Sequence, residues 1–177
     1  AYRDSLFKRS PGRYIITGIK LRLSRTKPLQ LGYRDLEDYL GDAVSPELDA
    51  LTVAEAVMAI RRRKLPDPEM IPNAGSFFKN PVVSADKHSQ LQAAHPDVVG
   101  YPQNGTVKLA AAWLIDQSGW KGYRNALVGV HNRQALVLIN HSGGAGSDVL
   151  KLASEIRQSV QERFGVNLEM EPGIVGG

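Results

Sequence analysis

The segment Asn73–Pro81 (Asn-Ala-Gly-Ser-Phe-Phe-Lys-Asn-Pro) has the most unusual composition in the chain. Its Gly75-Ser76 step lets backbone amides approach a ligand closely, and a serine hydroxyl can donate or accept a proton. Lys79 and Asn80 add a cation and an amide nearby. The residues alone favour a simpler interpretation, a turn that leads into a buried Phe-Phe pair. No GxSxG motif surrounds Ser76, so the motif of a hydrolase nucleophile is absent.

Two further sets of charged residues could bind a ligand. The run Arg61–Lys64 is entirely basic. Cations in the last turn of a helix offset the negative end of its dipole, but Arg and Lys also bind phosphate. Glu171 lies near the end of an alternating segment and could place a carboxylate inside a cleft, although an exposed position on an edge strand is the default. Aromatic residues do not alternate with the charges as they do in a platform that stacks nucleic-acid bases.

The composition excludes several classes of protein. The chain has 177 residues, 42% hydrophobic and 23% charged, which is typical of a globular protein that buries a core. It has no cysteine, which excludes disulfides and cysteine nucleophiles and favours an intracellular location. The four histidines form no HExxH pair, so no metal site is predicted. No apolar run reaches the roughly 18–20 residues that cross a bilayer, and the net charge of +4 is a weak sign of nucleic-acid binding.

The elements that must position these residues follow from periodicity and capping signals. Strands and helices interleave after residue 66, which indicates an α+β or α/β unit. The proline-rich segment 65–75 is a candidate domain boundary. Strands are predicted at Tyr14–Leu23, at Ala135–Asn140 (a central strand) and at Val166–Glu171; helices are predicted from Thr52 to Lys64, from Ser84 as a cap to about His95, from Val107 to Gln117 after an Asn104-Gly105 turn, and from Ser147 as a cap to Gly165.

Several stretches, in this order, resemble one known family. They are Tyr2–Lys8, Lys64–Pro68, Asn73–Pro81, Val107–Ala111 with Trp113–Gln117, and Gln134–Asn140. Together they are similar to UDP-N-acetylenolpyruvoylglucosamine reductase, the MurB flavoenzyme of bacterial peptidoglycan synthesis, in its longer, type I form. The resemblance extends over essentially the whole chain, and the nine-residue serine segment is its most specific part.

The resemblance implies a reaction and roles for three residues. NADPH reduces FAD, and hydride then passes from the flavin to the terminal carbon of UDP-N-acetylglucosamine enolpyruvate, giving UDP-N-acetylmuramate. The adjacent carbon becomes carbanion-like and must be protonated. Ser76 matches the serine that supplies this proton, and Arg3 and Glu171 match the pair that polarises the neighbouring carboxylate. The family pattern near the end is Leu-Glu-Pro-Glu, whereas this chain has methionine at position 170 in place of the proline.

The resemblance also implies a set of binding residues. Tyr33, Lys64 and Asn80 match contacts to the substrate diphosphate, and Tyr101 and Gln134 match further substrate contacts. Tyr2 matches a tyrosine beside the flavin and nicotinamide site. No metal is implied.

The implied organisation is α+β: part of a second FAD-binding domain (1–64), an α/β substrate-binding domain (65–171), and a tail (172–177) that returns toward the FAD-binding half. Most of the FAD site would precede Ala1, so we expect a fragment that binds FAD weakly. We expect a cytoplasmic monomer that binds NADPH and the sugar nucleotide, with no nucleic acid and no membrane. Two alternatives stay open: a UDP-sugar binding module without activity, and a basic RNA-binding domain.

Overall fold

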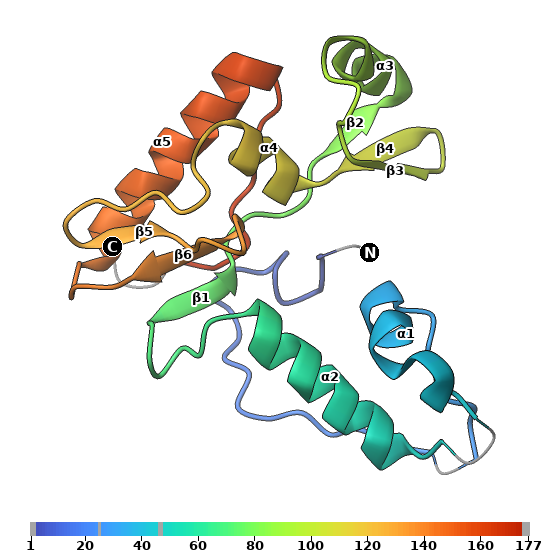
Figure 1. Ribbon diagram of the computed structural model, residues 1–177. Coiled ribbons are helices and arrows are strands. Elements are labelled where there is room, and N and C mark those ends of the chain that lie inside the picture. Colours follow the sequence, from blue (N-terminus) through green and yellow to red (C-terminus); the bar gives the residue numbers. More distant parts are fainter. Residues whose placement is uncertain (1–2, 25, 46–47, 175–177) are drawn as a thin grey trace. The chain divides into compact units, whose positions relative to one another are not determined.

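The computed structural model describes residues 3–24, 26–45 and 48–174 (Figure 1). The chain divides into two compact units, Ala1–Arg61 and Arg62–Gly177. Among the described residues, no helix has the length and apolar character needed to cross a membrane. In order, the elements are α1 (Arg34–Leu40), the 3-10 helix η1 (Gly41–Ala43), α2 (Ala50–Lys64), β1 (Asn73–Ser76), β2 (Val82–Ser84), α3 (Ala85–Ala94), β3 (Gly100–Gln103), β4 (Thr106–Leu109), α4 (Ala111–Gln117), β5 (Val128–Val130), β6 (Val137–Asn140) and α5 (Gly146–Phe164).

The first unit has a small helical core. Among the residues described there, this core is formed by Leu36 and Leu40 of α1 with Ala56 and Ile60 of α2. The strand predicted at Tyr14–Leu23 is wrong: this segment has no regular structure, and Ile15 is 92% exposed. A strand needs a neighbour that accepts its backbone hydrogen bonds and covers its apolar face. The described part of the first unit contains no other strand, so the alternating pattern has nothing to pair with.

Helix α2 begins two residues earlier than its capping signal predicts. The carboxylate of Asp49 accepts a hydrogen bond of 2.7 Å from the backbone N–H of Thr52, so Asp49 caps the helix and Thr52 lies inside it. The same hydrogen bond holds the pKa of Asp49 below its ordinary value, because the bond favours the charged carboxylate. The helix ends at Lys64, before Pro66, as the sequence predicts.

The second unit contains two three-stranded sheets with strand orders β1-β6-β5 and β2-β4-β3 (Figure 1). Every pairing between these described strands is antiparallel, so the unit is α+β and the predicted α/β substrate domain is wrong in this respect. Its β5–β6 and β3–β4 pairs are joined by short turns, which suffice for antiparallel neighbours; parallel neighbours need a longer crossover. The predicted central strand is confirmed as β6, although it begins at Val137.

The β3–β4 hairpin corrects a predicted helix. Asn104 and Gly105 have φ values of 45° and 79°, as in a two-residue hairpin turn, so the predicted turn is confirmed. Val107 and its neighbours pair with β2 and β3, so the helix expected from Val107 begins only at Ala111. The apolar residues of this stretch enter the core from a strand instead of a helix, a distinction that a short apolar run does not reveal.

The capping signals predict the start of α3 correctly, whereas α5 begins earlier than its signal predicts. The Ser84 hydroxyl accepts a hydrogen bond of 3.1 Å from the N–H of Lys87, which confirms the predicted start of α3. Helix α5 begins at Gly146 instead of after Ser147, and the carboxylate of Asp148 accepts the N–H of Ala145 at 2.8 Å. Gly165, with φ of 60°, ends α5 as predicted. One continuous hydrophobic core joins both sheets to α3, α4 and α5.

Candidate functional site

Ser76 ends β1, directly after a bulge. The Asn73 carboxamide accepts the N–H of Gly75 at 2.9 Å and donates to the carbonyl of Ile71 at 2.8 Å. Gly75 has φ of +69°, a left-handed conformation that glycine adopts without strain. The pairing of β1 with β6 is irregular between Asn73 and Ser76, as expected for a bulge with glycine in this conformation. The Asn-Ala-Gly sequence therefore sets the direction in which Ser76 leaves the strand.

The residues after Ser76 are hydrogen-bonded along both edges. On one edge, Ser76 lies opposite Val137, and the N–H of Phe77 donates to the carbonyl of Leu136 at 2.7 Å. On the other edge, the N–H of Glu171 donates to the carbonyl of Phe77 at 2.9 Å. Ser76 and Phe77 thus lie beside two segments, around Leu136 and around Glu171, that are far from them in the chain.

These two edges bring together three of the predicted site residues. Gln134 belongs to the turn before β6, and its carbonyl accepts the N–H of Val137 at 2.9 Å. Glu171 is one hydrogen bond from the residue after Ser76. The strand predicted at Val166–Glu171 is wrong as a regular strand: only an isolated bridge joins Phe78 to Met170.

Asn80 has a defined orientation. Its side-chain oxygen accepts the N–H of Ala111, the first residue of α4, at 2.9 Å. Because an N–H can only donate, the carboxamide oxygen must face the helix and the amide NH₂ must face away from it. Asn80 can therefore donate a hydrogen bond to a ligand, whereas its side-chain oxygen is already bonded to the N–H of Ala111. Lys79, beside it, forms an ion pair with Glu169.

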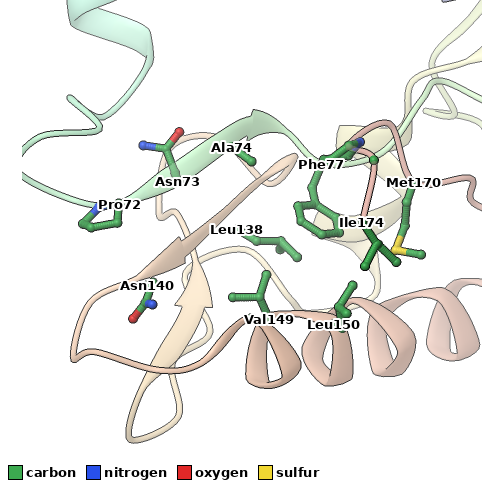
Figure 2. Close-up of a pocket in the computed structure, with 13 residues that line it drawn as sticks. Pro72, Asn73, Ala74, Phe77, Leu138, Asn140, Val149, Leu150, Met170 and Ile174 are labelled. Atoms are coloured by element: carbon green, nitrogen blue, oxygen red, sulfur yellow. The ribbon is translucent and has the colours of Figure 1, made fainter. Parts of the chain in front are cut away.

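An apolar pocket lies behind β1, and the sequence did not predict it (Figure 2). Its volume is about 340 Å³. Phe77, just after β1, and Leu138 of β6 point toward Val149 and Leu150 of α5, and Ile174 covers one side. None of the lining residues is charged. The pocket therefore suits apolar side chains or small apolar molecules and has no means of binding a diphosphate.

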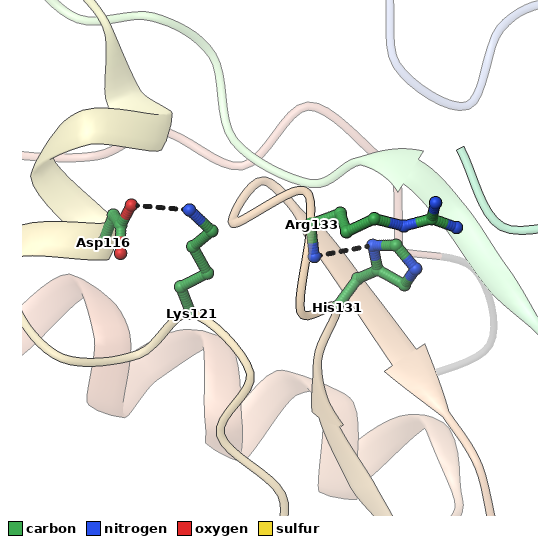
Figure 3. A network of polar contacts seen from close by, with 4 residues as sticks. All are labelled: Asp116, Lys121, His131 and Arg133. Carbon is green, nitrogen blue, oxygen red and sulfur yellow. Dashed lines mark hydrogen bonds and ion pairs between the residues drawn. The ribbon is translucent and has the colours of Figure 1, made fainter. Parts of the chain in front are cut away.

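His131 is the buried polar residue of the described structure, with 6% of its surface exposed. It directly follows β5, and its ring nitrogen Nδ1 accepts the backbone N–H of Arg133 at 3.3 Å (Figure 3). Burial lowers the pKa of His131 below its ordinary value, and the guanidinium groups of Arg133 and Arg124 lower it further. The sequence gives no signal for this role, because the burial of His131 depends on residues far from it in the chain.

The other predicted site residues belong to other elements or to the first unit. Lys64 ends α2 and is half-buried within the second unit. Tyr101 is exposed on β3, with the ammonium group of Lys108 6.0 Å from its ring centre. Arg3 and Tyr33 are exposed residues of the first unit. Tyr2 lies outside the described residues.

Comparisons with known proteins agree on one family. Residues 67–175 match the family model for the C-terminal domain of UDP-N-acetylenolpyruvoylglucosamine reductase. The chain is 51% identical over 174 residues to the UDP-N-acetylenolpyruvoylglucosamine reductase of Pseudomonas aeruginosa, which covers 98% of this chain and 51% of that protein. The protein of the same name from Cupriavidus pinatubonensis is 52% identical over 177 residues, covering 99% of this chain and 52% of its own length. The chain spans about half the length of the curated relatives it matches.

Proposed function

Because the chain belongs to the UDP-N-acetylenolpyruvoylglucosamine reductase family, we propose that a protein of the relatives' full length reduces UDP-N-acetylglucosamine enolpyruvate to UDP-N-acetylmuramate, with FAD as cofactor and NADPH as the source of hydride. In this proposal residues 1–64 belong to an FAD-binding domain, residues 65–171 bind the substrate and supply the proton, and residues 172–177 return toward the FAD-binding half. The assignment also makes the protein a cytoplasmic monomer that acts in cell-wall synthesis, and so in cell shape and division.

The observation that carries this proposal is that the segment around Ser76 is hydrogen-bonded to Leu136 on one edge and to Glu171 on the other. Reduction of the enolpyruvyl double bond adds hydride to the terminal carbon and a proton to its neighbour. The second addition is the task we assign to the Ser76 hydroxyl. A serine is a weak acid, so the developing negative charge must be stabilised on the adjacent carboxylate. Glu171 is held by the backbone next to Ser76, and we assign it, with Arg3, to that stabilisation.

The other assigned residues would bind the anionic and sugar parts of the substrate. Lys64, Tyr33 and the amide NH₂ of Asn80 are assigned to the diphosphate, and Gln134 and Tyr101 to further contacts. Support comes from chemistry: a diphosphate accepts hydrogen bonds only, and Asn80 has its oxygen engaged by α4 and its donor left for a ligand.

The chain spans about half the length of its relatives, and we propose that FAD is held mainly by the half that it does not span. The apolar side chains of the segment Tyr14–Leu23 are exposed, and the apolar pocket of the second unit has no charged lining residue. We assign Tyr2 to the flavin and nicotinamide site.

This leads to a first prediction about the 177-residue chain. Purified alone, it should be colourless and bind FAD weakly, because in this proposal the half of the relatives' length that the chain does not span holds most of the FAD. The measurement is an absorption spectrum of the protein after dialysis against FAD, with intact mass to verify the chain. A protein-bound flavin spectrum at one equivalent would contradict it. The alternative, a UDP-sugar binding module without activity, also predicts a colourless chain, and it is tested instead by titrating the chain with the sugar nucleotide.

A second prediction concerns Lys64. In the full-length protein, Lys64→Ala should raise KM for the sugar nucleotide about 10- to 150-fold, as expected for loss of a charge-assisted hydrogen bond. Turnover should change little, because the diphosphate does not change charge during reduction and its contacts stabilise ground state and transition state alike. Arg62→Ala is the matched control, since Arg62 is an exposed cation of the same helix end. If Lys64→Ala and Arg62→Ala changed KM equally, Lys64 would only offset the helix dipole and would not bind the diphosphate.

A third prediction separates the two functions of Asn80. Asn80→Ala should destabilise the second unit by about 1 kcal/mol, because α4 loses an acceptor at its start. Asn80→Asp keeps that acceptor and should leave stability nearly unchanged. It replaces the donor by a negative charge, however, and should weaken binding of the sugar nucleotide by more than Asn80→Ala does. Denaturant unfolding and calorimetric titration measure the two quantities. Wild-type affinity in the Asp variant would remove Asn80 from the site.

A further inference from the structure

The turn that joins β5 to β6 is held by a chain of hydrogen bonds that begins at His131. The backbone N–H of His131 donates to the carbonyl of Val137 at 2.9 Å, and the N–H of Val137 donates to the carbonyl of Gln134 at 2.9 Å. Inside the turn, Nδ1 of His131 accepts the N–H of Arg133 at 3.3 Å (Figure 3). The residue just before Gln134 is thus fixed by the histidine side chain.

This hydrogen bond requires one protonation state. Nδ1 can accept the Arg133 N–H only when it carries no proton, so the ring must be neutral with its proton on Nε2. The surroundings favour the same state: the ring is buried, and the charged groups that act on it among the described residues are the guanidinium groups of Arg133 and Arg124. Both are positive and oppose a second positive charge.

We infer that neutral His131 is a positioning residue, which holds the β5–β6 turn so that Gln134 faces the substrate beside Ser76. This rests on the proposed function, in which Gln134 contacts the substrate. The turn also reaches Ser76 directly, because the carbonyl of Leu136 accepts the N–H of Phe77 at 2.7 Å. A change in the turn therefore acts on the edge of the serine segment that pairs with Leu136 and Val137.

Acid should release the turn. Protonation places an N–H on Nδ1, opposite the Arg133 N–H, so two donors face each other and the bond is lost. Because folding lowers the pKa of His131, the unfolded or released form binds the proton more readily. The stabilisation is then complete above the ordinary histidine pKa of about 6.5 and is lost as the pH falls from there toward the lower folded value.

The experiment compares three variants of the full-length protein across pH. His131→Asn retains an acceptor on the atom bonded to Cγ, which can take the N–H two residues on, but it does not titrate. His131→Leu removes the acceptor. We expect the Leu variant to have, at every pH, a KM for the sugar nucleotide about 5- to 10-fold above the neutral-pH wild-type value, as for one lost hydrogen bond, with kcat nearly unchanged. The Asn variant should have a wild-type KM at neutral pH and no rise in acid, whereas the wild-type KM should rise. His88→Asn in α3 is the matched control and should keep the wild-type profile.

A nuclear magnetic resonance titration of the wild-type protein gives a reading that does not depend on activity. The Arg133 amide proton should shift with the titration of the His131 ring and should not shift in His131→Asn. An Arg133 amide that ignores the ring titration would overturn the hydrogen bond, and so would an acid rise in KM that persists in the Asn variant. If His131→Leu does not fold, the Arg133 amide titration and the pH profile of KM in His131→Asn still test the inference. If Gln134→Ala left KM unchanged, Gln134 would not contact the substrate, and the inference would fail because the proposed function is wrong at this residue. The Arg133 amide proton would still shift with the His131 ring in that case.

Discussion

Replacing Ser76 by alanine in the full-length protein is expected to slow consumption of the enolpyruvyl substrate by about 10²- to 10⁴-fold, the usual cost of removing a positioned acid. Oxidation of NADPH in the absence of that substrate should stay near the wild-type rate. The reason is that only the reduction of the enolpyruvyl group leaves a carbanion-like carbon that needs a proton. Stopped-flow measurement of the two processes separates them.

Ser76→Cys is the matched variant for this prediction. A thiol at the same position can also give up a proton, so the Cys variant should recover part of the rate that the Ala variant loses. Ser76 follows a bulge built on Asn73 and Gly75, and both substitutions keep that backbone. Equal slowing of both processes in Ser76→Ala would mean that Ser76 shapes the site and does not supply the proton.

Phe78→Ala should destabilise the second unit by about 3–5 kcal/mol, the usual cost of truncating a buried aromatic residue. Phe78 is 1% exposed, its ring lies 5.5 Å from that of Phe77 in an edge-to-face arrangement, and its backbone bridges to Met170. The loss is a large part of the roughly 5–15 kcal/mol that stabilises a typical domain. The Phe-Phe pair of the serine segment thus has a structural function that the serine itself does not share.

The measurement for Phe78 can be confined to the second unit. Both tryptophans of the chain, Trp113 and Trp120, belong to that unit, so urea unfolding followed by tryptophan fluorescence reports on it alone. Val82→Ala is the control: Val82 is exposed on β2, and its truncation should change the free energy of unfolding by about 0.5 kcal/mol or less. A similar small effect of Phe78→Ala would show that the serine segment does not depend on this packing.

The sequence by itself determined the family and most of the local structure of the second unit. The serine segment, the cap of α3 at Ser84, the end of α5 at Gly165 and the buried strand β6 all follow from signals contained within a few neighbouring residues. A cap, a turn or a periodic apolar stripe depends on local backbone geometry, which the residue types specify directly.

The tertiary structure alone decided which segments become partners. The sequence does not state that Phe77 pairs with both Leu136 and Glu171, that the Asn80 oxygen caps α4, or that His131 is buried. The alternating pattern of Tyr14–Leu23 predicted a strand that is not formed, because a strand exists only with a neighbour to accept its hydrogen bonds. Pairing and burial depend on residues far apart in the chain, so the site around Ser76 follows from the fold and not from any one motif.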